Sequence, residues 1–270
     1  MALALTAELA RHLESGAAEA LPRLLAALRS VAPDQPSDLL ARDDVAALYG
    51  GPTSPLNDAI GLGLFGPATP EALDAVEAFF EAHSHPSVVS VISLAHPTAL
   101  ELTAARGYRL TDFGHRWVLD LRAWHSPLAA PDERVRPAHT PEEELTWARA
   151  VEGGFADADD LGPEVDLTAA RTFFRLEGAM PVIALQDGQA AAGGMLDLVG
   201  NVACLFAAAT RPTYRRRGLQ AALLDWRLRA AQERGKALAT IETDPGSASQ
   251  RNVERMGFQL AYAIATLERP

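Results

Sequence analysis

The sequence predicts an α/β fold of the α+β kind, with two tandem copies of a mixed, mostly antiparallel sheet flanked by helices. Apolar runs typical of strands alternate with segments that show the 3.6-residue apolar period of helices. The dipeptide Asp187-Gly188 is typical of a two-residue hairpin turn, which joins antiparallel strands. Both halves of the chain show the order of strand, helix, strand, short capped helix and glycine-aromatic pair. These three observations decide the predicted fold class.

The helices of the second half carry end signals. Thr140 is a predicted N-cap, and the three glutamates that follow Pro141 suit a helix N-terminus. Ser247 and Gln250 have the spacing of a capping box, and Gly235 is typical of a helix C-terminus. Helices are expected over residues 141–155, near 166–176, from 219 to about 234, and over a short segment after 247. Strands are expected over residues 180–186, 189–199, 202–209, 237–242 and 258–267.

The first half repeats this order. A strand over residues 59–65 precedes a helix with Thr69 as N-cap and Pro70 at its first position. The remaining signals are a strand over residues 88–94, a capping box of Thr98 and Glu101, the pair Gly107-Tyr108, which matches Gly257-Phe258, and a closing strand over 117–121. The repeat predicts two copies of one fold, and chance similarity between two α/β segments is the alternative.

The predicted domain boundaries follow from a proline-containing segment. Pro127 and Pro131 lie among small residues, which is typical of a linker. We therefore expect a first domain over residues 1–124, a linker over 125–133 and a second domain over 134–270.

The composition limits the function classes. The 270 residues carry a formal net charge of -11, which argues against binding nucleic acid through a general basic field. The single cysteine, Cys204, excludes an intrachain disulfide framework and fits a reducing compartment. No stretch is long and apolar enough to span a membrane, and the first residues lack a signal-peptide layout, so a cytoplasmic location is expected. The histidines lack metal-ligand spacing, and no metal is expected.

A basic cluster, Arg215, Arg216, Arg217 and Gly218, lies where an apolar strand gives way to an amphipathic helix that begins near Leu219. The first amides of a helix have no intrahelical partner, and the helix dipole adds positive character there. Together with guanidinium groups they suit a diphosphate. Gly218 is expected to let the backbone approach it, because a Cβ would intrude. A solvated surface run of arginines is the alternative.

On these residues the chain resembles the GCN5-related N-acetyltransferases, whose phosphate loop reads Q/R-x-x-G-x-G/A after V-x-P. Thr210-Arg211-Pro212 matches the preceding motif with Thr in place of Val. Arg215 and Gly218 match the loop, and Gln220 departs from its final Gly or Ala. The resemblance covers residues 135–270. In the first copy, the corresponding loop over residues 66–70 has no arginine and two prolines, so that copy is expected to be degenerate.

The resemblance implies an acyl-CoA N-acyltransferase fold with acetyl-CoA as co-substrate. It implies that pantetheine runs along the strand that ends at Thr210, where a backbone N–H polarises the thioester carbonyl. The implied acetyl-CoA contacts are Ala208, Ala209, Thr210, Arg215, Arg216, Arg217, Gly218, Leu219, Gln220, Ala221, Ser249 and Asn252. The alanines of the strand equally suit packing under a helix, Ser249 suits a helix N-terminus, and Asn252 suits the surface.

The catalytic groups are less clear, because Val253 occupies the position where many family members carry a tyrosine that acts as the general acid. Glu242, at the end of a strand, is the first candidate for the general base, with an exposed strand-end carboxylate as the alternative. Tyr262 is a second candidate, as the acid, with a core aromatic as the alternative. Phe155 is expected either to line the acceptor pocket or to anchor its helix.

The predicted function is transfer of an acetyl group from acetyl-CoA to the amine of a small molecule or an amino terminus, by direct attack in a ternary complex. The alternatives are a non-catalytic acyl-CoA-binding or regulatory protein and a tandem acetyltransferase like mycothiol synthase. The expected partner is an amine acceptor, with neither nucleic acid nor membrane. A homodimer is left open.

Overall fold

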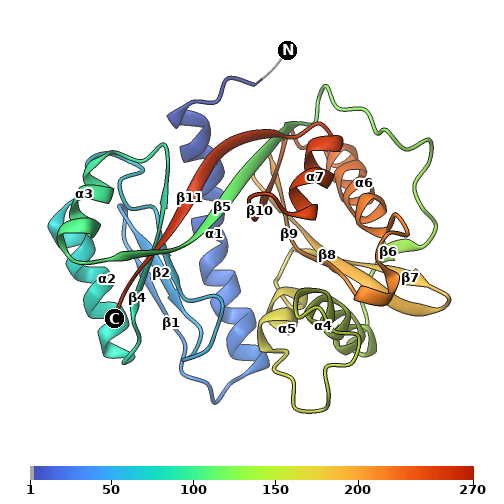
Figure 1. Ribbon diagram of the computed structural model, residues 1–270, viewed down its shortest axis with the longest axis horizontal. Coiled ribbons are helices and arrows are strands. Elements are labelled where there is room, and N and C mark those ends of the chain that lie inside the picture. The colour runs from blue at the N-terminus through green and yellow to red at the C-terminus, as the bar shows by residue number, and fades with distance from the viewer. Residues whose placement is uncertain (1–2) are drawn as a thin grey trace. The chain divides into compact units, whose positions relative to one another are not determined.

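The computed structural model describes residues 3–270, which form two compact units (Figure 1). Unit 1 comprises the chain up to Trp117 together with Thr243–Pro245 and Leu260–Pro270. Unit 2 comprises Val118–Glu242 and Gly246–Gln259. This grouping differs from the contiguous domains over 1–124 and 134–270, because the last strand of the chain is compact with unit 1 and residues 125–133 are compact with unit 2.

The sheet of unit 1 has the strand order β1-β2-β3-β4-β11-β5. The strands are β1 (Asp38–Ala41), β2 (Ala46–Tyr49), β3 (Asp58–Ile60), β4 (Ser87–Ile92), β5 (Arg109–Asp120, of which Val118 onward belongs to unit 2) and β11 (Gln259–Arg269, whose first residue belongs to unit 2). β3 pairs in parallel with β4, whereas β1–β2, β2–β3 and β4–β11 are antiparallel. β11, the last strand of the chain, therefore lies beside β4.

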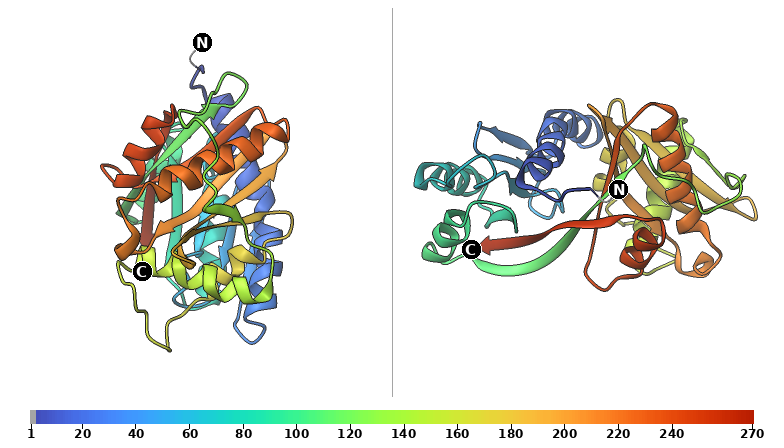
Figure 2. Two further views of the ribbon diagram at one scale, coloured as in Figure 1. Left: turned by 90° about the vertical axis from the view of Figure 1, so that its right-hand side faces the viewer. Right: turned by 90° about the horizontal axis from the view of Figure 1, so that it is seen from above.

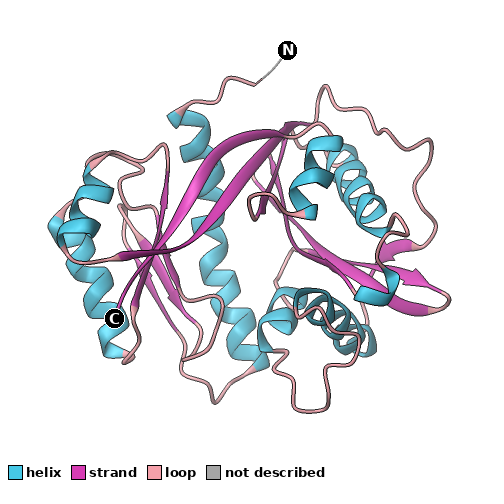
Figure 3. Cartoon of the chain, viewed as in Figure 1, coloured by secondary structure: helices cyan, strands magenta, loops and turns pink. Residues whose placement is uncertain are grey.

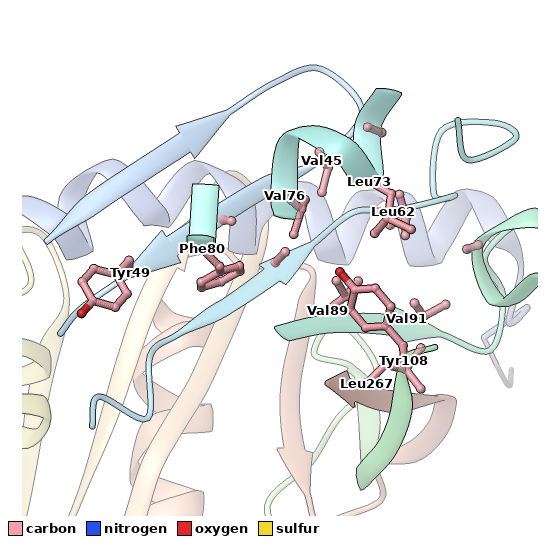
Figure 4. Packing of buried hydrophobic residues seen from close by; sticks show 14 residues of the cluster. Val45, Tyr49, Leu62, Leu73, Val76, Phe80, Val89, Val91, Tyr108 and Leu267 are labelled. Carbon is pink, nitrogen blue, oxygen red and sulfur yellow. The ribbon is translucent and has the colours of Figure 1, made fainter. Parts of the chain in front are cut away.

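The helices of unit 1 are α1 (Ala7–Val31), α2 (Pro70–Ala82) and α3 (Thr98–Ala105). The apolar face of α2, with Leu73, Val76 and Phe80, packs in one core with Val89 and Val91, which are alternate residues of β4 (Figure 4). Burying such side chains contributes about 1.5–3 kcal/mol each. This core fixes unit 1 as a folded body in its own right.

Unit 2 contains the sheet order β10-β9-β8-β7-β6. The strands are β6 (Val135–Pro137), β7 (Met180–Gln186), β8 (Gln189–Val199), β9 (Val202–Thr210) and β10 (Leu238–Thr243, whose last residue belongs to unit 1). The pairs β6–β7, β7–β8 and β8–β9 are antiparallel and β9–β10 is parallel, so the predicted mixed, mostly antiparallel sheet is confirmed.

Helices cover both faces of the unit 2 sheet (Figures 2 and 3). They are α4 (Pro141–Phe155), α5 (Thr168–Phe174), α6 (Leu219–Glu233) and α7 (Ala248–Arg255). A Cβ placed on Gly193 would meet Trp147 of α4, whereas one on the next residue, Gly194, would meet Arg227 of α6. Because neighbouring strand residues point to opposite faces, α4 and α6 lie on opposite sides of β8.

The same crossover occurs in both units. In unit 1, β3, α2 and β4 form a parallel strand pair joined by a helix, and β9, α6 and β10 do the same in unit 2. A short helix and a glycine-aromatic pair follow each crossover, α3 with Gly107-Tyr108 and α7 with Gly257-Phe258. This topology agrees with the predicted tandem repeat.

Three local predictions need correction. The strand expected over 59–65 is only Asp58–Ile60, since the chain enters a series of turns with positive φ at Gly61 and Gly63. Thr98 does not cap α3, because its hydroxyl accepts the amide of Ala68 instead. Ser247 caps α7, but the side chain of Gln250 accepts from the amide of Gly246 rather than completing the box.

The segment over 125–133 is fixed along α6. The Ser126 hydroxyl donates to the buried carboxylate of Asp225, and Arg229 donates to the carbonyl of Leu128 at 2.7 Å. Gln232 donates to the carbonyl of Trp124 at 3.1 Å. These bonds tether the segment that was expected to be a linker.

Candidate functional site

The parallel strands β9 and β10 separate partway along their length. Their pairing runs from Val202 and Leu238 to Leu205 and Ile241. Beyond Leu205, β9 continues to Thr210 along β8 alone. The result is a fork, defined here as Phe206–Thr210 on one side and Glu242 on the other, in which β10 no longer pairs with the edge of β9 that faces away from β8. Such a strand edge suits pairing with another extended chain.

A β-bulge shapes the β9 side of the fork. Gly193 pairs with Ala209 and Met195 pairs with Phe206, so Ala207 and Ala208 together oppose Gly194. Ala207 has φ 48, in the left-handed region that non-glycine residues seldom occupy. A bulge interrupts the ladder and bends its strand, so it redirects the amides of this segment.

Helix α4 covers one face of this segment of β9. A Cβ on Gly154 would lie 2.5 Å from the Cβ of Ala209 and 2.7 Å from the amide of Thr210. The helix therefore approaches the strand as closely as a residue without a side chain allows. Ala209 therefore packs under α4, which the sequence analysis gave as the alternative role of these alanines, and it also lies in the fork.

The basic loop begins directly after β9. Gly218 is the N-cap of α6 with φ 80, and no side chain caps this helix end. The amides of Leu219, Gln220 and Ala221 lie in the first turn, which has no intrahelical acceptors for them. A Cβ on Gly218 would meet no atom of the chain within 4 Å, so its left-handed backbone, rather than crowding, is what the structure shows to favour glycine here.

The three arginines of the loop have different partners. The guanidinium of Arg215 bonds the carboxylate of Asp157 and the carbonyls of Gly154 and Thr210, the last two at 2.9 and 3.2 Å. Arg217 lies 3.7 Å from the carboxylate of Asp187. Arg215 is therefore held by the scaffold.

Arg216 contrasts with its two neighbours. All three arginines are exposed, but Arg216 has φ 63, and within residues 3–270 its guanidinium has no hydrogen-bond or ion-pair partner. Arg216 is the loop arginine best placed to meet an anion from solvent.

Two further contacts tie the loop to β9 and to the segment after α4. The side chain of Gln220 donates to the hydroxyl of Thr210 at 2.8 Å, so it points back to the strand. Asp159 accepts the amide of Thr213 at 3.0 Å and lies 3.5 Å from Arg211. The sequence reasoning missed the role of this acidic segment, although its aspartates lie close in sequence to a helix end.

The family comparison matches this region. The model described as the acetyltransferase (GNAT) family matches residues 142–258, which include the fork and the basic loop. Residues 142–258 form a domain of the GNAT acetyltransferase family. This confirms the resemblance that the loop motif indicated.

Solved structures extend the likeness beyond the GNAT domain. A GCN5-related N-acetyltransferase from Kribbella flavida is 17% identical with a TM-score of 0.64, over 93% of this chain and 95% of that one. A tandem GNAT protein from the clavulanic acid biosynthesis pathway is 16% identical with a TM-score of 0.57, over 93% and 94%. A GCN5-related N-acetyltransferase from Sphaerobacter thermophilus is 16% identical with a TM-score of 0.57, over 86% of this chain and 75% of that one. No curated protein sequence matches. The fold of the whole chain is thus that of GNAT proteins, one of them tandem.

The structure separates the two catalytic candidates. Glu242 is exposed and directly follows the last paired residue of β10, at the base of the fork. Tyr262 lies in unit 1, where its hydroxyl donates to the carboxylate of Glu14 at 2.6 Å. Burial, reinforced by Glu14, raises the pKa of Tyr262. A phenol held in this way is a poorer proton donor, whereas Glu242 stays a candidate base.

The remaining predicted residues lie at helix ends of the GNAT domain. Val253, at the usual tyrosine position, is 1% exposed, so its side chain is in the core. Ser249 is exposed in the first turn of α7, and Asn252 accepts from Arg255 at 3.0 Å. Phe155 is 61% exposed, so it does not anchor α4 in the core and stays available to an acceptor.

A half-buried carboxyl on α4 escaped the sequence reasoning. Glu152 lies one turn before Phe155, and burial followed by the nearby charge of Asp166 raises its pKa. A carboxyl at this end of α4 suits an ammonium group.

Among residues 3–270, no group of three or more His, Cys, Asp or Glu side chains is arranged to hold a metal ion. Within the same residues, every helix is too short or too polar to cross a membrane.

Proposed function

We propose that this protein is an N-acetyltransferase that moves an acetyl group from acetyl-CoA to the amine of a small molecule or an amino terminus. The observation that supports the proposal most is the continuity of the fork, the bulge at Ala207–Ala208 and the basic loop within the GNAT domain. A pantetheine arm, which is extended and carries amide groups, suits the edge of β9 in the fork, and a diphosphate suits the uncapped N-terminus of α6.

The residues fit the donor at both ends. The amides of Leu219, Gln220 and Ala221 offer donors without a helical acceptor, and exposed Arg216 adds charge. In the fork, the bulged segment directs backbone N–H groups toward the thioester oxygen. Ala207 and Ala208 have small side chains, which leave space for a substrate beside this segment of β9.

The chemistry then follows from these placements. The ammonium of the acceptor loses a proton to Glu242, directly or through water, and the free amine attacks the thioester carbon. The new C–N bond forms as the carbonyl electron pair moves to oxygen, which the bulge amide stabilises. Collapse breaks the C–S bond, and the thiolate takes the second proton of the amine.

Calorimetric titration with acetyl-CoA, paired with thiol release over a panel of amines, tests the proposal. Binding with amine-dependent thiol release is the expected result. Absence of binding to the unchanged protein contradicts the proposal, because the arginines would then be only a surface run.

A non-catalytic acyl-CoA-binding protein is the second candidate, favoured by the buried Val253 at the usual tyrosine position. Binding without thiol release on any amine supports this candidate. Among the amines, an amino sugar–inositol tests the acceptor of a mycothiol-synthase-like enzyme, which the tandem fold keeps open.

A further inference from the structure

Arg227, in the middle of α6, is a buried cation that the family motifs do not explain. It is 1% exposed, and burial lowers its pKa to about 9, so it stays charged at neutral pH. Its Nε donates to the carbonyl of Leu223 at 3.0 Å and its Nη1 to the carbonyl of Met195 at 3.1 Å. Within residues 3–270 no carboxylate pairs with it. Burying a charge without a counter-charge costs free energy, so its retention needs a reason.

The guanidinium lies against the bulge from the α6 side. A Cβ on Gly194 would be 3.0 Å from Nη1 of Arg227 and 3.2 Å from the Cβ of Ala208. The guanidinium and the bulged strand therefore meet at one glycine. Without a side chain at Gly194, there is room for the guanidinium.

The hydrogen bond to Met195 falls where the ladder is irregular. Gly194 stands opposite the two bulged residues, and regular pairing resumes at Met195 with Phe206. A bulge leaves backbone groups without their usual ladder partners, and buried carbonyl groups need donors. Arg227 supplies such a donor at this point, so the position of the guanidinium and the shape of the bulge depend on each other.

We propose that Arg227 is a positioning residue for acyl transfer, which fixes the Ala207–Ala208 bulge through Met195 and places an unpaired positive charge beneath the fork. The inference rests on the proposed function. As the amine attacks, the thioester oxygen becomes negatively charged. The buried guanidinium, which has no carboxylate partner among residues 3–270, stabilises that charge. When the C–S bond breaks, the electron pair leaves on sulfur, and the carbonyl re-forms beside the same charge.

The test uses the full-length chain and acetyl-CoA labelled with 13C at the carbonyl. Difference infrared spectroscopy measures the carbonyl stretch of the bound thioester, which needs no acceptor. Arg227→Met removes the charge and keeps the apolar volume, and Arg227→Lys keeps the charge but not the planar donor pair. Arg234→Met is the matched control, since Arg234 is exposed near the end of the same helix.

In the unchanged protein and in Arg234→Met, the carbonyl band is expected at lower frequency than for acetyl-CoA in water. In Arg227→Met this shift is lost while the acetyl-CoA Kd stays within about twofold, and Arg227→Lys retains part of it. With any amine that accepts acetyl, kcat of Arg227→Met falls by about tenfold or more with little change in KM for acetyl-CoA.

The outcomes separate this inference from the function on which it rests. A full infrared shift in folded Arg227→Met overturns the positioning role while acetyl-CoA binding stands. If Arg227→Met does not fold, two other single variants decide. A full infrared shift in Arg227→Lys together with a full shift in Gly194→Ala, whose added methyl group crowds the guanidinium, overturns the positioning role as well. Absence of acetyl-CoA binding to the unchanged protein contradicts the proposed function itself.

Discussion

Among single residues, the exposed arginines of the basic loop differ in their partners. Arg215 bonds Asp157, Gly154 and Thr210, whereas Arg216 has a left-handed backbone and no side-chain partner within residues 3–270. The sequence presents both as the same motif. Their roles diverge because of contacts with the segment after α4, which no local pattern reveals.

Arg216→Glu is expected to weaken acetyl-CoA binding by about tenfold or more, because a charge that attracts the diphosphate becomes one that repels it. The melting temperature should change little, since Arg216 is exposed. Calorimetric titration and thermal melting check both, with Arg234→Glu as a control of equal charge change away from the loop. Equal affinities for the two variants contradict the role of Arg216.

Arg215→Ala is expected to lower the free energy of unfolding by about 1–2 kcal/mol, because three hydrogen bonds of a partly exposed side chain are lost. Urea denaturation measures the change. The affinity for acetyl-CoA should fall as well, since the loop loses its link to Thr210. A variant with unchanged stability and weaker binding would instead assign Arg215 to the anion directly.

At the scale of elements, α4 begins at Thr140, the N-cap that the sequence predicted, and the structure adds a capping box with Glu143 that the sequence analysis had not assigned. Thr140 accepts the amide of Glu143, and Glu143 accepts the amides of His139 and Thr140. These bonds, together with Arg136, hold the pKa of Glu143 at about 2, below its ordinary value of 4.5. The carboxylate form is therefore favoured in the folded chain.

Because the pKa of Glu143 is depressed on folding, its contribution is complete above about pH 4.5 and is lost as the pH falls toward 2. For a side chain partly open to solvent, we expect on the order of 1–2 kcal/mol. Glu143→Gln keeps a capping side chain without the charge. Unfolding measured from pH 2 to pH 7 should show the two proteins converging at low pH. A constant difference would contradict this linkage.

Most helix ends were predictable because caps are local, although the capping boxes expected at Thr98 and Ser247 did not form. Thr69, Thr140 and Gly235 lie where their patterns indicated. The bulge at Ala207–Ala208 was not predictable, since it depends on the register between two strands. Arg227 was overlooked although it lies among Leu223, Leu224 and Leu228 on α6, and a charged residue within a buried stripe is a usable signal.

At the scale of the whole molecule, the two repeats differ in their helix N-termini. In the first repeat, Thr69 caps the amide of Ala72, the hydroxyl of Thr98 takes the amide of Ala68, and Pro67 and Pro70 have no amide hydrogen. In the second, Gly218 leaves the first amides of α6 uncapped. The first repeat therefore offers few donors to a diphosphate, as its lack of arginines indicated.

The placement of β11 could not be predicted from the sequence. Its pattern marked a last strand of the second repeat, but it pairs with β4 in unit 1. Arg269 lies 2.6 Å from the carboxylate of Glu77 on α2, which secures the end of this strand. Strand order depends on contacts between distant segments, so it lies beyond periodicity and caps.

We expect one donor site per chain, in the GNAT domain of the second repeat. The stoichiometry of acetyl-CoA binding tests this, by calorimetric titration of the full-length chain and of Arg216→Glu. One site per chain is expected, weakened by about tenfold or more in the variant. Two sites per chain, or one site whose affinity the variant leaves unchanged, would contradict it.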